Sequence, residues 1–451
     1  MTFKITNTIG VESFDASPGA DILSSALRKG CSVRYSCRQG VCGSCSATVV
    51  KGTYSIKSPE AQAHHVDGAP ERVLLCETYA LSDLEIAYEP YNGAVSSFAA
   101  QIGGLVFANS TVAIVTLDIV SATSLSFEAG QFVAIRWMEG DLKYFSIASV
   151  DETGRQIELH IRLQPGGAFT QWLFQRAKIG DFLGLEGPHG DFVWKSSPGR
   201  PVLLLATGTG FAPIHALIEN HALWNHSAPV YLYWGAREAV DFYKEAVVAE
   251  WSGKGLSIRY VPVLSREAQG WAGPVGRLPS VIQQSHEDLS GFDVYACGSP
   301  EMIDGARQVF CNSLGLDPAR FYADPFTVRP MSAAPAPEVI HLSVEFPDGV
   351  SGRLPSSTGV SMLQSLMNAN LRLDHVCGGG AVCASCRVQV ARTEQGPIEE
   401  YEQDLLDCLK ERRCGERLAC QLKVTEILDE AIIRLPGSPA QMSRVFGGAH
   451  D

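Results

Sequence analysis

Residues 35–50 read YSCRQGVCGSCSATVV, and residues 375–390 read HVCGGGAVCASCRVQV. Each stretch places three cysteines in a short loop that contains glycine, and each continues directly into a β-rich run. A further cysteine follows each loop, Cys76 after 30 intervening residues and Cys420 after 33. This internal repeat predicts two related small domains, one near each end of the chain.

The first set of cysteines has the spacing of a plant-type [2Fe–2S] centre. It reads C-x4-C-x2-C with a distant fourth cysteine. Four thiolates have to reach two irons, so a tight loop supplies three of them and a remote segment supplies the fourth. The alternative is a structural zinc site, which also takes four cysteines but usually pairs two C-x2-C knuckles. The predicted iron ligands of this set are Cys37, Cys42, Cys45 and Cys76.

The second set reads C-x5-C-x2-C, and three later cysteines compete for the fourth position. The repeat favours Cys420, because Cys76 and Cys420 each follow an arginine and short apolar residues. Cys408 and Cys414 lie in a polar, helix-like segment, so we expect them not to bind iron. The predicted ligands of this set are Cys377, Cys383, Cys386 and Cys420.

Composition sets the class of protein. The 451 residues suggest about three or four domains, and 45% hydrophobic with 19% charged residues is ordinary globular composition. The net charge of −13 argues against a nucleic-acid partner, and the clustered cysteines favour metal binding in a reducing compartment. No apolar run approaches the ~18 residues of a membrane span, and the beginning lacks the features of a signal peptide. We therefore expect a cytoplasmic protein with no membrane partner.

The segment between the two cysteine-rich parts changes character along its length. Short alternating strands separated by glycine and proline predict an antiparallel β-barrel over residues 98–197. Apolar strands that alternate with helix-length segments predict a parallel sheet, covered on both faces, over residues 198–327. Residues 328–338, rich in proline and alanine, predict a semi-rigid linker.

These parts resemble known families. Residues 1–93 resemble plant-type ferredoxin domains, and residues 339–446 resemble adrenodoxin-like [2Fe–2S] ferredoxins. The part between them resembles the ferredoxin–NAD(P) reductase superfamily, in the ferredoxin–FAD–NAD order of class I oxygenase reductases. The resemblance implies a multidomain α+β and α/β fold. Its parts are a β-grasp ferredoxin, an antiparallel β-barrel that binds FAD, a doubly wound parallel sheet that binds NAD, and a second β-grasp ferredoxin.

The flavin motif of this superfamily, R-x-[YF]-S-x-x-[ST], reads KYFSIAS at residues 143–149. The resemblance implies that Phe145 stacks on the isoalloxazine and that Ser146 hydrogen-bonds near its N5. Lys143 stands where the superfamily has arginine, so it keeps the positive charge but loses the bidentate fork. A later turn resembles the G-x-x-[ST] element that opens a helix and suits a phosphate, through its N–H groups and the Thr170 hydroxyl. The predicted flavin-binding residues are Lys143, Tyr144, Phe145, Ser146, Ser149, Gly167 and Thr170.

The nicotinamide motifs follow two strands of the predicted parallel sheet. ATGTGFAP at residues 206–213 is similar to the family's GTGxAP loop, whose glycines let the backbone approach a pyrophosphate. Cys297 is the first residue of CGSPEM, which is similar to the family's C-G-x-x-x-M element. The resemblance implies that the Cys297 thiol lies beside the nicotinamide. Without the resemblance, Cys297 would be interpreted as a buried residue at the end of a strand. Phe326 either covers the flavin or is a core aromatic. The predicted loop residues are Gly208, Thr209, Gly210 and Pro213, and the predicted catalytic residues are Cys297 and Ser146.

Three polar residues after the second and third strands bear on the choice of nucleotide. Arg237, Ser265 and Arg266 could hold a 2′-phosphate, and the last two are similar to the NADP-binding pair of plastid-type reductases. The alternative is that they are solvated loop residues. Oxygenase reductases of this layout mostly use NADH, so the resemblance predicts NADH, with NADPH as the alternative.

The implied function is electron transfer from NADH through FAD and two [2Fe–2S] clusters to a terminal Rieske non-haem iron oxygenase or P450. The alternatives are a reductase for another acceptor, such as a deoxysugar dehydratase, and a non-enzymatic redox sensor. We expect the C-terminal domain to be a built-in carrier on a linker of ~10 residues, which spans about 30 Å when extended. Grouped acidic side chains are expected to dock the partner or to form a solvated helix face. They are Glu399, Glu400, Glu402, Asp404 and Asp407.

Overall fold

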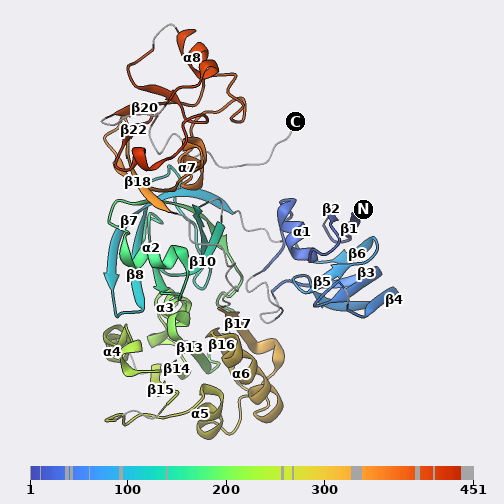
Figure 1. The fold of residues 1–451 in the computed structure, drawn as a ribbon. Coiled ribbons are helices and arrows are strands. Elements are labelled where there is room, and N and C mark those ends of the chain that lie inside the picture. The colour runs from blue at the N-terminus through green and yellow to red at the C-terminus, as the bar shows by residue number, and fades with distance from the viewer. Residues whose placement is uncertain are drawn as a thin grey trace. The chain divides into compact units, whose positions relative to one another are not determined.

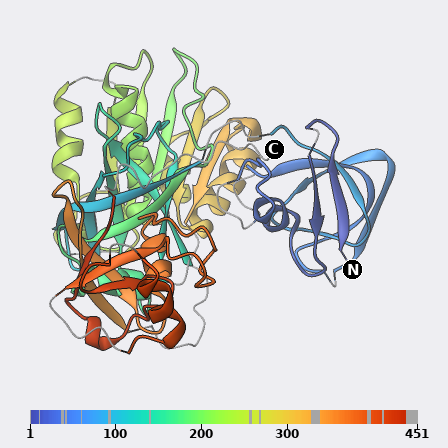
Figure 2. The same cartoon turned by 90° about the horizontal axis from the view of Figure 1, so that it is seen from above.

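The structure is a computed structural model of the 451-residue chain. The residues that it describes are 2–10, 12–35, 40, 44–59, 61–90, 95–138, 141–254, 258–266, 269–326, 338–391, 397–409 and 412–437. Figures 1 and 2 show the chain as a ribbon in two views. It divides into two compact units. One comprises residues 1–94, 128–131 and 189–329, and the other comprises residues 95–127, 132–188 and 330–451. The predicted linker lies almost entirely outside the described residues.

The first unit begins with a small mixed sheet, in the strand order β2-β1-β6-β3-β4 with β5 paired to β3. Helix α1 (Ile22–Arg28) covers it, and the Asp21 side chain caps this helix by accepting from the backbone N–H of Ser24, 2.7 Å away. The apolar face of α1 packs into the same core as the strands. The strands are β1 (Phe3–Asn7), β2 (Ser13–Ala16), β3 (Ser46–Ile56), β4 (Ala63–Leu74), β5 (Thr78–Ala80) and β6 (Leu84–Ala87).

The rest of the first unit is a parallel sheet in the order β15-β14-β13-β16-β17. Strands β14 and β15 lie on one side of β13, and β16 and β17 lie on its other side. The carboxyl ends of β13 and β16 therefore form the topological switch point. The strands are β13 (Val202–Thr207), β14 (Val230–Ala236), β15 (Ile258–Leu264), β16 (Asp293–Gly298) and β17 (Phe321–Pro325). The helices are α3 (Phe211–Asn220), α4 (Glu245–Lys254), α5 (Leu278–Ser285) and α6 (Pro300–Ser313).

The second unit contains a closed barrel in the order β10-β11-β8-β7-β12-β9. Inward side chains such as Val115, Ile135 and Leu159 fill its interior with an apolar core, as the alternating pattern predicts. The strands are β7 (Ser96–Phe107), β8 (Val112–Ile119), β9 (Phe132–Trp137), β10 (Asp141–Val150), β11 (Gln156–Arg162) and β12 (Phe182–His189), and helix α2 (Ala168–Gln175) lies between β11 and β12.

The C-terminal part of the second unit repeats the design of the N-terminal sheet. Its order is β19-β18-β22-β20-β21, and β22 runs parallel to β18 just as β6 runs parallel to β1. The elements are β18 (Val339–Glu345), β19 (Ser351–Ser357), α7 (Met362–Asn368), β20 (Arg387–Ala391), α8 (Glu400–Asp407), β21 (Glu416–Leu418) and β22 (Ile432–Arg434). The predicted fold class is therefore confirmed. Among the described helices, none has the length and apolar character that a membrane span needs.

Candidate functional site

The first cysteine set brings together residues that are far apart in the chain. The Sγ atoms of Cys45, just before β3, and Cys76, in the turn after β4, lie 3.2 Å apart, and both residues are buried. The backbone N–H of Gly40 donates to the Cys76 sulfur at 3.1 Å. Gly40 has φ +74°, a left-handed conformation that favours glycine. Cys37 and Cys42 lie outside the described residues.

The second set places its four predicted ligands in two pairs. Cys377 and Cys383 are joined by a side-chain hydrogen bond, and Cys386 and Cys420 are joined by another. Two thiols on each of two irons is the ligand arrangement of a [2Fe–2S] centre. A zinc site would instead bring four sulfurs to one ion.

The loop that carries Cys377 and Cys383 turns its backbone N–H groups toward sulfur. The N–H of Val382, then those of Gly379 and Gly380, donate to Cys377, and together with the Cys383 thiol they lower the pKa of Cys377 to about 6. N–H groups that stabilise thiolate suit an iron–sulfur centre. These residues therefore fit the group that the spacing predicts.

Left-handed residues shape this loop. Gly378 and Gly379 have φ values of +64° and +95°, and two alanines, Ala381 and Ala384, have φ values of +54° and +50°. A loop with several left-handed residues aims successive N–H groups into one concavity, which binds anions. A diiron centre held by four thiolates carries negative charge, so the backbone conformation and the predicted ligand agree.

The structure places the two flavin motifs side by side. Residues 143–149 lie on β10, where residues 143–145 are half-buried and Ser146 is buried together with the two residues after it. The Phe145 ring lies 5.5 Å from the ring of Phe169, in the first turn of α2. Tyr144 packs edge-on against Phe132 of β9, and the register of β10 against β11 shifts just before Ser149. Motifs some twenty residues apart in sequence thus meet at one end of the barrel.

The turn before α2 is tied by its own side chain. The Thr170 hydroxyl accepts from the backbone N–H of Gln164 at 3.0 Å and lies 3.1 Å from the carbonyl oxygen of Gly167. A Cβ on Gly167 would lie 2.8 Å from that hydroxyl oxygen. Thr170 therefore shapes the turn, and the first N–H groups of α2, which have no partner within the helix, are the groups suited to a phosphate.

The nucleotide loop lies at the switch point of the parallel sheet. A Cβ on Gly210 would lie 2.3 Å from the Cys297 carbonyl oxygen, so the loop passes against the backbone of β16. Gly298 has φ +136°, and the N–H of Ser299 donates to Thr207 at 2.9 Å. Cys297 is fully buried, and burial raises the pKa of its thiol well above the usual value. The GTG turn and the CGSP turn thus pack directly against each other.

Other predicted nucleotide residues gather at the same edge. Thr209 and Pro213 are buried in the GTG turn and the first turn of α3, and the N–H of Phe326 donates to the Gly298 carbonyl at 2.7 Å. The N–H of Ser265 donates to the Ala236 carbonyl at 2.9 Å, which brings the ends of β14 and β15 together.

The two arginines at that edge are exposed. Arg237 follows β14 directly and Arg266 lies beside Ser265 after β15, so both are placed at the carboxyl end of the sheet. Neither makes an ion pair with a residue that the structure describes. Both therefore place positive charge at the carboxyl end of the sheet.

Two residues that the motifs did not single out contact the first cluster loop. His189 Nδ1 hydrogen-bonds the Tyr35 hydroxyl at 3.1 Å, and Asp191 accepts from the Ser44 hydroxyl at 2.5 Å. Tyr35 precedes the first predicted cysteine and Ser44 directly precedes the third, whereas His189 ends the barrel strand β12 and Asp191 follows it. No local pattern signals this contact, because the partners are about 150 residues apart in the chain.

One predicted docking residue is not on the surface. Glu402 is fully buried, and its carboxylate accepts two hydrogen bonds from Arg417, each 3.0 Å long, and one from the Leu418 N–H at 2.8 Å. The expectation that Glu402 belongs to an exposed acidic surface was therefore wrong. It anchors α8 to β21 through a buried ion pair.

Glu402→Ala should destabilise the C-terminal domain by about 3–5 kcal/mol, because it leaves the Arg417 charge buried without its partner. The exposed neighbour Glu400 provides the control, and Glu400→Ala should change stability by no more than about 0.5 kcal/mol. Urea unfolding of the full chain, followed through the visible absorbance of the C-terminal centre, measures both. Equal midpoints for the two variants would contradict the prediction.

Family models match most of the chain. The 2Fe-2S iron-sulfur cluster binding domain matches twice, at residues 7–81 and 345–425. The oxidoreductase FAD-binding domain matches residues 106–194, and the oxidoreductase NAD-binding domain matches residues 204–308.

Whole relatives agree with these matches. The CDP-6-deoxy-L-threo-D-glycero-4-hexulose-3-dehydrase reductase of Yersinia pseudotuberculosis is 32% identical over 317 residues, which cover 69% of this chain and 95% of the relative. Reductase component 2 of the terephthalate 1,2-dioxygenase of Comamonas is 30% identical over 323 residues, which cover 70% and 95%. The crystal structure of the Amycolatopsis cytochrome P450 reductase GcoB matches with a TM-score of 0.57 at 29% identity, over 72% of this chain and 99% of that one. The chain belongs to the ferredoxin–NAD(P) reductase superfamily and is an electron-transferring oxidoreductase with FAD-binding, NAD-binding and [2Fe–2S] domains.

Proposed function

We propose that this protein passes electrons from NADH through FAD to two [2Fe–2S] clusters and on to a terminal oxygenase. The observation that carries the proposal is the second set of paired thiols, in a chain that already holds flavin, nicotinamide and ferredoxin folds. FAD, when bound, exchanges electrons in pairs with a nicotinamide and singly with an iron–sulfur centre. The relatives named above are covered nearly whole, yet they leave close to a third of this chain unmatched. The second ferredoxin match, at residues 345–425, supports a further [2Fe–2S] domain in this chain.

The chain's own residues have separate tasks in this proposal. Lys143 and the first turn of α2 hold the flavin diphosphate, and Ser146 orients the isoalloxazine. The GTG loop binds the nucleotide pyrophosphate, while Cys297, neutral in its buried position, lies beneath the nicotinamide. No side chain is needed as a general base, because the transfers are redox steps of the cofactors.

The decisive experiment is an anaerobic titration of the intact protein with NADH, followed by electron paramagnetic resonance. Two distinct S = 1/2 signals of the [2Fe–2S] type are expected, with flavin and cluster absorbance bleached rapidly. A single signal would remove one cysteine set from the proposal. Slow or absent bleaching would favour a redox sensor over an electron-transfer enzyme.

A second candidate function is electron delivery to a deoxysugar dehydratase. The observation that favours it is the 32% identity to the Yersinia hexulose-3-dehydrase reductase. The two functions differ only in the terminal acceptor, so affinity capture from the native cell extract, with the captured protein identified, separates them. Capture of a dehydratase would replace the oxygenase in the proposal.

Arg266→Gln tests the choice of nucleotide. Because Arg266 is exposed at the carboxyl edge of β15, a 2′-phosphate would contact it directly. The substitution should lower kcat/KM for NADPH by about 10-fold, the value of one charged hydrogen bond, and leave kcat/KM for NADH unchanged. Steady-state reduction of an artificial acceptor measures both. An equal loss of kcat/KM with NADH would contradict the assignment of Arg266 to the 2′-phosphate.

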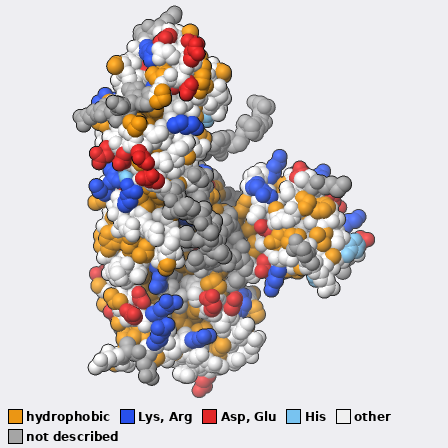
Figure 3. Space-filling model, viewed as in Figure 1, with side chains coloured by type: hydrophobic (Ala, Val, Ile, Leu, Met, Phe, Trp, Pro, Cys, Tyr) orange, Lys and Arg blue, Asp and Glu red, His pale blue; other side chains and the backbone are white. Residues whose placement is uncertain are grey.

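The proposed docking surface surrounds the C-terminal thiols. Val376 and Val382, beside Cys377 and Cys383, are 85% and 73% exposed. Figure 3 shows acidic side chains next to apolar ones over α8. The exposed acidic members are Glu399, Glu400, Asp404 and Asp407. An apolar centre with an acidic rim suits a partner with a basic rim around its own redox centre.

Turnover with the natural acceptor should therefore fall as salt rises from about 0.05 M to about 0.5 M, because the acidic rim is screened. Turnover with a small neutral acceptor is the control and should stay constant. Salt-independent coupling to the natural acceptor would exclude an electrostatic docking surface.

A further inference from the structure

We propose that the C-terminal [2Fe–2S] domain is a fixed module docked on the FAD-binding barrel, rather than a carrier that swings on residues 328–338. The role of the domain in electron transfer rests on the proposed function, whereas its docking rests on contacts within one compact unit. In Figure 1, β18 and α7 lie next to the barrel strand β7.

The two parts share one apolar core. Ala99 of β7 and Phe182 of β12 are buried in the same cluster as the core residues of the C-terminal domain. The rings of Phe182 and Phe346 meet edge to face with their centroids 5.8 Å apart. A swinging domain would have to expose this shared core at every departure, at roughly 25 cal/mol for each Å² of apolar surface.

Backbones approach each other too closely for side chains. A Cβ on Gly184 of the barrel would lie 2.1 Å from the carbonyl oxygen of Asn368, at the end of α7. A Cβ on Gly352 of β19 would lie 2.4 Å from the carbonyl oxygen of Gly180. The two glycines lie on opposite sides of the interface between the barrel and the C-terminal domain, which we call the seam. A side chain at either position would hold the two backbones apart.

Buried polar groups give the seam a single register. The side-chain amide of Asn370 donates to the carbonyl oxygens of Phe98 and Leu185, each 2.9 Å away. The N–H of Arg353 donates to the Gly180 carbonyl at 3.0 Å, in a single β-bridge between the two parts. A shift of the domain by one residue would break these bonds together, and each buried group left without a partner costs about 1–3 kcal/mol.

Charge and an aromatic contact reinforce the same register. Arg353 Nε lies 3.3 Å from the Asp181 carboxylate, which is fully buried. The indole N–H of Trp172 donates to His341 Nε2 at 3.1 Å, so His341 is neutral there, and burial lowers its pKa to about 4. Trp172 belongs to α2, whose first turn is the proposed flavin-phosphate site. The docked domain therefore contacts the helix that binds the flavin.

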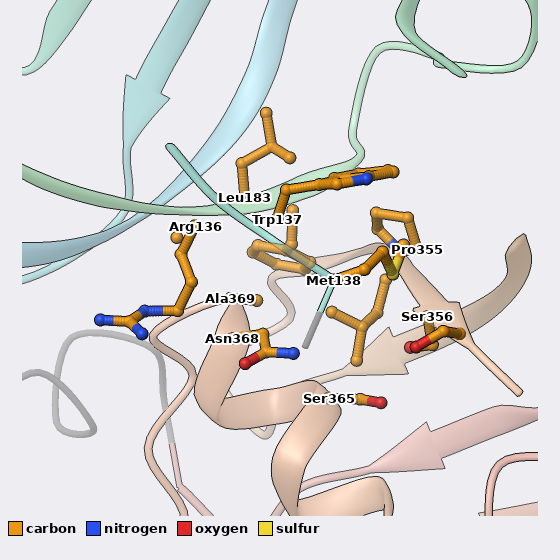
Figure 4. Close-up of a pocket in the computed structure, with 13 residues that line it drawn as sticks. Arg136, Trp137, Met138, Leu183, Pro355, Ser356, Ser365, Asn368 and Ala369 are labelled. Carbon is orange, nitrogen blue, oxygen red and sulfur yellow. The ribbon is translucent and has the colours of Figure 1, made fainter. Parts of the chain in front are cut away.

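The seam also encloses a small polar cavity, and Figure 4 shows residues of both parts around it. About 10 Å³ is open to the centre of a water molecule, which is room for one water. Around it, the indole N–H of Trp137 and the hydroxyls of Ser356, Ser357 and Ser365 are buried without a hydrogen-bond partner in the described part of the chain. Residues with unpartnered polar atoms from both sides thus line a space that is large enough for one water.

Lengthening the predicted linker in the full chain tests the proposal. A Gly-Ser insertion that triples residues 328–338 would lower the effective concentration of a tethered carrier by about 5-fold. For a docked module, the rate at which NADH reduces the C-terminal cluster should not change, as measured by anaerobic stopped-flow absorbance and freeze-quench electron paramagnetic resonance. A slowing that grows with the length of the insertion would overturn the proposal. Loss of all NADH-dependent cluster reduction in the parent protein would instead refute the proposed function.

A second experiment asks whether the seam alone holds the domain. With a specific protease site inserted in the linker, the cleaved C-terminal piece of the parent should still elute with the rest of the protein in gel filtration. Asn370→Gly removes the two amide hydrogen bonds, and glycine suits the left-handed backbone at this position, where φ is +53°. Gly184→Leu adds a side chain where the backbone of Asn368 is in close contact. The double variant should release the cleaved C-terminal piece. Glu430→Gly is the matched control, at φ +62° in the same domain, and should retain it. Separation of the cleaved parent, or retention by the double variant, would overturn the proposal.

Discussion

Cys420→Ser in the full-length protein should remove the C-terminal cluster and leave the N-terminal one, so that iron falls from about four to about two atoms per polypeptide. The reason is the contact between these thiols, because Cys420 is hydrogen-bonded to Cys386 and would hold the cluster together with it. A serine oxygen is a poor substitute for a thiolate at this centre. Iron analysis, together with the number of electron paramagnetic resonance signals after reduction, measures the loss.

Cys414→Ser provides the matched control. Cys414 lies six residues before Cys420 and is exposed. Its substitution should leave both the iron content and both signals intact. If Cys414→Ser lost iron and Cys420→Ser did not, the assignment of the fourth ligand would be reversed.

Gly210→Ala should lower kcat/KM for NADH by about 100-fold or more. The added Cβ would lie 2.3 Å from the backbone oxygen of Cys297, so the GTG loop must move away from β16. A displacement of about 1 Å in a positioning loop costs about two orders of magnitude in rate. Stopped-flow reduction of the bound flavin by NADH measures the effect directly.

Gly253→Ala in α4 serves as the control, since nothing lies within 4 Å of its added Cβ. It should keep full activity and gain up to about 1 kcal/mol of stability from helix propensity. Reduction of the flavin by dithionite should be normal in both variants, which separates a nucleotide defect from a folding defect. Normal NADH kinetics in Gly210→Ala would show that the loop does not bind the nucleotide.

Local chemistry explains which features the sequence could predict. The cysteine spacing reflects the need of two irons for ligands from a tight loop. Because this spacing occurs twice, it predicted two related small domains, and the structure has two sheets of similar topology. The strand–glycine–helix pattern is likewise local, and it predicted a loop at Gly208–Gly210 after an apolar strand, which the structure has directly after β13. Flavin and nucleotide motifs depend on the same short-range rules.

Long-range pairing explains what the sequence could not predict. Glu402 has the polarity of an exposed residue, and only the fold shows that Arg417 neutralises it in the interior. Asn370 and its acceptor Phe98 are 272 positions apart, so no pattern along the chain reports that contact. For the same reason a composition typical of a linker suggested a mobile carrier, whereas the contacts of the domain favour a docked one.

The left-handed alanines Ala381 and Ala384 have a consequence for the cluster-free protein. Each left-handed alanine raises the conformational free energy of the loop by about 1–3 kcal/mol. The bonds between the thiolates and a [2Fe–2S] cluster would offset this strain. We therefore expect the thiol-bearing segment of the cluster-free protein to open more readily, and to be cut more readily by proteases, than the same segment with its centre in place.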